Sequence, residues 1–160
     1  MEQKWKNRAL ADIIAHKVCD EYSSLTSRAK TKVDALHLYK RGIDWCLEND
    51  SPSIDLLRSY RDDCAYNGIF IDRHFDDELL IDQPVYVFHN CSGTIRVGLN
   101  LKKRIIPMLY FANGCDMTVV GESPTRVRVP LTVYGDNNIV AETDGSIEPV
   151  VCKHEIRMKK

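Results

Sequence analysis

Five histidines, six cysteines and a run of carboxylates are the side chains of this 160-residue chain that could do chemistry. A metal ion needs several such ligands at short, regular spacings, because all of them must reach one ion. The histidines show no H-x-x-x-H or H-E-x-x-H spacing, and Cys152 and His154 have no companion ligands. We therefore predict neither a metal site nor a cofactor.

The cysteines are spread evenly, without a C-x-x-C pair, at Cys19, Cys46, Cys64, Cys91, Cys115 and Cys152. The charged start of the chain is not followed by an apolar segment and a small-residue cleavage site, so we expect no export signal. Cysteines of a protein made in a cytoplasm stay reduced. We therefore expect these six as reduced core residues.

The carboxylates gather in one stretch and are Asp62, Asp63, Asp72, Asp76, Asp77, Glu78 and Asp82. Parallel β-helix lyases and hydrolases use clustered carboxylates on one outer face as acids and bases. Here they fall mostly in an expected connector, which favours a solvated acidic patch. The chain also lacks the G-x-S-x-G, G-x-G-x-x-G and P-loop motifs. We predict that the protein is not an enzyme.

A basic stripe consists of Lys102, Lys103, Arg104, Arg126 and Arg128. It is small and has no interleaved aromatic residues on which bases could stack. The formal net charge of −1 supplies no field that attracts nucleic acid or an anionic membrane. No apolar stretch approaches membrane-spanning length. We expect neither nucleic acid nor a membrane as a partner.

An internal repeat organises the second half of the chain, where Pro84, Pro107 and Pro130 each open a similar segment, 23 residues apart. Before residue 67 apolar residues recur at helical spacing, whereas seven of the eight glycines and five of the six prolines lie at or beyond Gly68. We predict an α+β fold, in which a helical module precedes a short parallel β-solenoid, or β-helix, of about three 23-residue coils. The expected parts are a helical module over 1–67, a capping strand and acidic connector over 68–83, solenoid repeats over 84–152 and a basic tail over 153–160.

Each coil is expected to contain three strands. The first strands are 85–88, 108–111 and 131–134, the second are 95–97, 117–120 and 139–141, and the third are 104–106, 126–129 and 147–151. Stacking residues one period apart predicts a structural ladder of aromatic rings at Phe88, Phe111 and Tyr134, and of turn residues at Asn90, Asn113 and Asp136. The last copy fits less well after Asn137, which indicates a slip of one residue. Three chains intertwined into one trimeric prism remain an alternative.

Both faces of the first strand are apolar, so one face must meet the helices or another subunit. The predicted interface residues are Val85, Val87, Met108, Tyr110, Leu131 and Val133, with Trp5 and Trp45 from the helices. A column of three coils is only about 14 Å tall and has two open β-edges that invite pairing. We therefore expect another chain to cover the carboxy-terminal end or this apolar face.

Two stretches carry a resemblance to a family, namely Lys32 to Ser53 and the repeated segments Val85 to Cys91 and Tyr110 to Cys115. The chain resembles small helix-plus-β-repeat proteins encoded by phages and prophages of Bacteroides-type bacteria, including crAss-like phages. The resemblance implies a phage context, with synthesis in the bacterial host cytoplasm and a place in the virion.

The expected function is that of a phage structural or assembly protein, in the tail, collar or capsid, which acts as a rigid oligomeric interaction platform. Its partners would be other copies of itself and other virion proteins. One alternative is an anti-defence or host-takeover protein that captures a host protein or a small nucleotide. A glycan-binding or glycan-processing β-helix is a further alternative, which would need exposed aromatics and carboxylates on one face.

Overall fold

A computed structural model describes residues 29–79, 81–97, 102–121, 127–143 and 147–153. The chain divides into two compact units, a helical unit over 1–67 and a sheet unit over 68–160. The division falls where the composition changes from helical periodicity to Gly, Pro and β-branched residues. Within the described ranges, no helix is long and apolar enough to cross a membrane.

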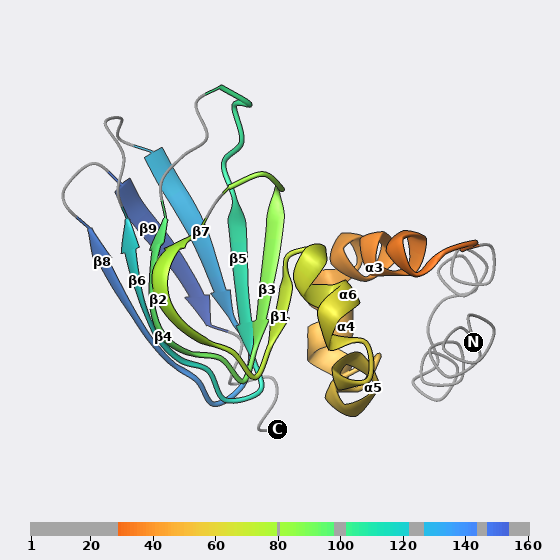
Figure 1. Cartoon of the computed structure of the whole chain (residues 1–160). Helices are drawn as coiled ribbons and strands as arrows, with labels where there is room; N and C mark the ends of the chain where they lie inside the picture. Colours follow the sequence, from red (N-terminus) through yellow and green to blue (C-terminus); the bar gives the residue numbers. More distant parts are fainter. Residues whose placement is uncertain (1–28, 80, 98–101, 122–126, 144–146, 154–160) are drawn as a thin grey trace. The chain divides into compact units, whose positions relative to one another are not determined.

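Four short helices make up the described part of the helical unit: α3 (Lys32–Arg41), α4 (Ile43–Asn49), α5 (Ile54–Arg58) and α6 (Arg61–Tyr66) (Figure 1). Thr31 and Asp34 form a capping box at the start of α3, and Ser53 caps α5. Their buried apolar side chains are Leu36, Tyr39, Ile43, Cys46, Leu47, Leu56, Leu57 and Cys64. Gly42 separates α3 from α4.

In the described part of the sheet unit, nine strands form two parallel sheets (Figure 1). The five-stranded sheet has the order β1 (Ile69–Ile71), β3 (Val85–His89), β5 (Met108–Ala112), β7 (Val127–Val133) and β9 (Ile147–Lys153). The four-stranded sheet has the order β2 (His74–Leu79), β4 (Ser92–Val97), β6 (Asp116–Gly121) and β8 (Asn138–Thr143). Successive strands alternate between the two sheets.

The fold is α+β, but the predicted β-solenoid of three-stranded, 23-residue coils is wrong, because the strands form two parallel sheets with two strands to each repeat. The expected third strand at 104–106 is absent from this described range, where Arg104 lies in a turn with a left-handed φ of 53° and Ile105 makes an isolated β-bridge. Two further expected strands merge into β7, which runs through Pro130. The stretch expected to be an acidic connector contains the strand β2.

The strand register differs from a uniform 23-residue period. Val85 pairs with Met108, 23 residues later, but Leu109 pairs with Leu131, 22 residues later. The register changes after Asn137 as well, where the sequence indicated it, because β6 and β8 pair 22 residues apart and β7 and β9 only 20. A further slip of one residue lies before Leu131. Because side chains alternate along a strand, this slip decides which residues of β7 face the other sheet.

Aromatic rings join the two sheets in the core. The Phe75 ring of β2 lies edge-on to Phe70 of β1 and Phe88 of β3, with centroid separations of 5.2 and 5.5 Å. Phe88 and Phe111 stack in register, 5.0 Å apart with ring planes 13° apart. Since Phe111 pairs with Val133, Tyr134 lies one position beyond the predicted aromatic ladder, although its ring is buried.

Candidate interaction surface

The predicted interface residues of the sheet unit separate into a buried and an accessible group. Val87, Tyr110, Leu131 and Val133 have at most 4% of their surface exposed. Leu131 and Val133 share register with Leu109 and Phe111, so the 22-residue spacing places them on the face that packs against the other sheet. Val87 and Tyr110 pair with each other in register and alternate with Phe88 and Phe111 along their strands.

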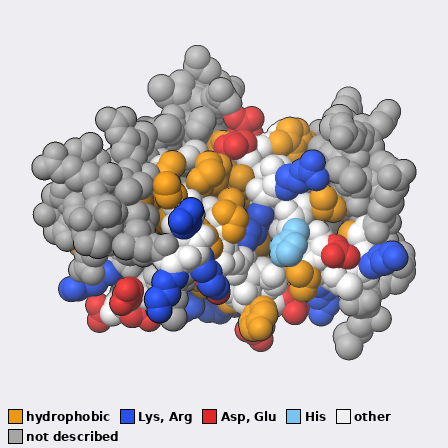
Figure 2. Space-filling model, turned by 90° about the horizontal axis from the view of Figure 1, so that it is seen from above, with side chains coloured by type: hydrophobic (Ala, Val, Ile, Leu, Met, Phe, Trp, Pro, Cys, Tyr) orange, Lys and Arg blue, Asp and Glu red, His pale blue; other side chains and the backbone are white. Residues whose placement is uncertain are grey.

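Val85 and Met108 remain accessible and pair with each other in register. Met108 is 39% exposed, and Ile106, two residues earlier, is 52% exposed. Lys102, Lys103 and Arg104 are exposed in the turn before β5. Figure 2 shows Lys and Arg side chains beside hydrophobic ones on the face seen from above.

The remaining predicted contact residues lie elsewhere. Trp45 is half-buried in α4, where its carbonyl oxygen accepts a hydrogen bond from the Asn49 side chain. Trp5 lies outside the described residues, as do the side chains of Arg126 and Arg128. Their part in a contact with another chain stays a prediction.

A column of left-handed residues marks the corner where the chain passes from one sheet to the other. Asp72, Asn90 and Asn113 have φ values of 54°, 50° and 60°, and Gly135 follows in the same register with 81°. Asp and Asn tolerate this conformation better than other L-residues, and glycine adopts it freely. Asn90 and Asn113 thus occupy turns as expected, whereas the third position is Gly135 and not Asp136.

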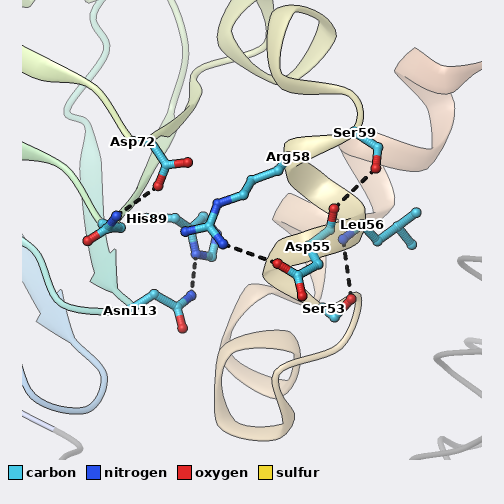
Figure 3. A network of polar contacts seen from close by, with 9 residues as sticks. Ser53, Asp55, Leu56, Arg58, Ser59, Asp72, His89 and Asn113 are labelled. Atoms are coloured by element: carbon cyan, nitrogen blue, oxygen red, sulfur yellow. Dashed lines mark hydrogen bonds and ion pairs between the residues drawn. The ribbon is translucent and has the colours of Figure 1, made fainter.

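Side-chain hydrogen bonds connect neighbouring turns of this corner. The Asn90 amide donates to Oδ1 of Asp72 at 2.8 Å, and the Asn113 amide lies 2.7 Å from Nδ1 of the buried His89 (Figure 3). Oδ1 of Asn137 accepts from the backbone N–H groups of Gly114 and Cys115. These polar groups form hydrogen bonds with the turn backbone and with one another, so their role is structural.

Two cysteines occupy the inside of the same corner. The Cys91 thiol lies 3.4 Å from the carbonyl oxygens of Phe70 and His89, and the Cys115 thiol lies 3.3 Å from those of Phe88 and Ala112. The side-chain contact with Cys115, together with burial, raises the pKa of the Cys91 thiol. A raised pKa keeps a thiol protonated and unreactive at neutral pH.

The expectation of reduced, buried cysteines is confirmed for four of the six, namely Cys46, Cys64, Cys91 and Cys115. Cys19 and the side chain of Cys152 lie outside the described residues. Across the described ranges, no group of three or more His, Cys, Asp and Glu side chains could hold a metal ion.

The two edges of the four-stranded sheet differ sharply in charge. At one edge, β2 carries Asp76, Asp77 and Glu78, all exposed. Asp77 pairs in register with the fully buried Ile95, so a carboxylate occupies an inward-facing position. Inward-pointing charges on an edge strand prevent another strand from adding to it.

The opposite edge, β8, lacks this protection. In the described part of the chain β8 pairs on one side only, with β6, and its sole charged residue is Glu142. The inward-facing Ile139 and Ala141 are half-buried, although their register partners Met117 and Val119 are 2% exposed. The sequence predicted open edges but did not identify β8 as one of them. The feature that could have identified it is the uncharged stretch 138–141, with the β-forming Ile139 and Val140.

Comparison with protein-family models, with curated proteins and with solved structures yields no match.

Proposed function

We propose that this protein is a non-enzymatic phage assembly component, a rigid platform that associates with copies of itself and with other proteins of the particle. The observation that carries the proposal is the contrast between the acidic β2 edge and the unguarded β8 edge. An uncovered edge strand with apolar side chains is a template for strand pairing.

The build of the sheet unit supports the same role. Parallel ladders run through both sheets, and the side chains between them are almost fully buried, as Phe88, Leu109 and Ile95 illustrate. Close-packed interiors deform little, so such a unit can hold a contact surface in fixed geometry. The phage context comes from the resemblance of Lys32 to Ser53 and of the repeated β segments.

Quantitative mass spectrometry of purified particles tests the proposal. An assembly component is expected at a fixed number of copies per particle, in a constant ratio to the major capsid protein. Its absence from particles, together with its presence in the lysate of infected cells, would contradict the proposal and favour the anti-defence or host-takeover alternative.

A further inference from the structure

The exposed main-chain groups of β8 are defined by its pairing with β6. The Asn138 N–H donates to the Cys115 carbonyl oxygen at 2.8 Å, so the main-chain groups of residue 138 point toward β6. Main-chain groups alternate in direction along a strand. Those of Ile139 and Ala141 therefore point away from β6, toward the open edge.

The side chains of β8 favour an apolar neighbour on that edge. Val140, on the outer face, is 45% exposed, and its register partner on β6 is Thr118. Ile139 and Ala141, on the inner face, are less buried than the β6 residues beside them. An added strand would complete this burial on both faces of the sheet.

A copy of the same chain could add to β8 through β2 or through β8. Continuing the parallel register with β2 would place Asp77 of the added copy beside Ala141, at a position where the carboxylate loses water without a cationic partner. Such head-to-tail pairing would also form open filaments. The acidic edge therefore excludes this arrangement.

Antiparallel pairing of β8 with β8 has no such conflict. With Val140 on the two-fold axis, Ile139 faces Ala141 of the other copy, and Asn138 faces Glu142. No like charges meet, and the outward main-chain groups of Ile139 and Ala141 become hydrogen-bonded to the other strand.

From these observations we infer that two copies of the chain associate through β8, with Val140 opposite Val140, to form one eight-stranded sheet. The inference rests on the proposed role as an assembly platform and specifies the contact that this platform uses. Its two-fold symmetry closes the assembly at the dimer.

Mass measurement by light scattering at micromolar concentration tests the dimer. The full chain is expected at twice 18.3 kDa. Val140→Lys places a charge on the axis, and Ala141→Pro removes an N–H that points to the edge and not to β6, so both are expected to be monomers with unchanged circular dichroism. The matched control Val33→Lys, at an equally exposed position on α3, is expected to remain a dimer.

Cysteine cross-linking tests the register. Val140→Cys is expected to form a covalent dimer on mild oxidation, because directly opposed, non-hydrogen-bonded residues lie about 4.5 Å apart at their Cα atoms. Asn138→Cys is expected to give only the background of the unchanged chain, since it faces residue 142.

Three results would overturn the inference: a monomeric full chain, a dimer that persists in Val140→Lys, or cross-linking through residue 138 instead of 140. A monomer would leave another occupant for the edge, such as residues 154–160 of the same chain. Each of these results concerns the edge alone, whereas absence from particles contradicts the proposed role and leaves the dimer measurement unaffected.

Discussion

At the scale of single residues, the close approach of two strands constrains one glycine of the sheet unit. Gly93 in β4 has a φ of 98°, and a Cβ atom there would lie 2.0 Å from the carbonyl oxygen of Phe75 on the neighbouring strand. Gly114, at the corner, has a similar φ of 86°, but its nearest neighbour would be 3.8 Å away. A side chain at Gly93 would therefore clash with the neighbouring strand, whereas Gly114 is favoured only for its backbone conformation.

We expect Gly93→Ala to lower the free energy of unfolding by about 3 kcal/mol or more, because a strand must move in addition to the backbone strain. Gly114→Ala is expected to cost about 1 kcal/mol, the strain of a left-handed alanine alone. Urea denaturation followed by circular dichroism measures both. Equal losses in the two variants would show that the close approach to Phe75 is not as described.

At the scale of elements, charge determines whether another strand can add to the β2 or the β8 edge of the four-stranded sheet. Asp77 faces inward on β2, beside Ile95, and remains exposed. Replacing it with valine would make this edge resemble β8, which presents Ile139 and Ala141 at the corresponding inward positions. The protection therefore depends on one carboxylate more than on the strand as a whole.

We expect Asp77→Val to associate beyond the dimer, because the β2 edge of one dimer could then pair with the β2 edge of another while both β8 edges stay paired within the dimer. Sedimentation velocity at increasing concentration measures this. Asp76→Val, which changes the outward face of the same strand, is the matched control and is expected to retain the size of the unchanged chain. Growth of both variants alike would point to net charge and not to the inward position as the protecting feature.

The sequence predicted those elements whose pattern is local and missed those fixed by pairing. The alternation and β-formers of Val85–His89 and Met108–Ala112 identified both strands correctly. The acidic run in His74–Leu79 read as a loop, because its apolar residues, Phe75 and Leu79, are too few to show the period. It forms a strand because parallel pairing with β4 satisfies its backbone.

The contact surface was predictable only in part, for the same reason. Assigning a uniform 23-residue period placed Leu131 and Val133 on an outer face, and a slip of one residue reverses every side chain that follows. Open edges follow from the strand count alone, but the choice between β2 and β8 depends on which of their residues face inward. Which residues face inward depends on the register of strand pairing, and the register could not be predicted from the sequence.

At the scale of the whole molecule, four buried thiols report separately on the two units. Cys46 and Cys64 lie in the helical unit, while Cys91 and Cys115 lie in the sheet unit. Burial, with a smaller contribution from the charge of Asp63, raises the pKa of Cys64 to about 12. A thiol in this state reacts only after the structure around it opens.

We expect an aromatic disulfide reagent at pH 8 to leave these four thiols unmodified in the native protein, and to modify all of them in denaturant. In partial denaturant Cys91 and Cys115 should react together, since one corner holds both. Mass spectrometry of the modified peptides resolves each site. Modification of Cys91 or Cys115 alone under native conditions would contradict a closed corner.

The connections at the two ends of the strands differ in how readily they can accept added residues. Passages through the left-handed corner take two to four residues, whereas those at the far end, which include the stretch from Val97 to Met108, take three to ten. These short connections are held by the side-chain hydrogen bonds of Asn90 and Asn113, so they cannot accept added residues without breaking those bonds. Insertions and sequence changes should therefore accumulate in the loops at the far end. A related protein could change its contact residues there and keep the same two sheets.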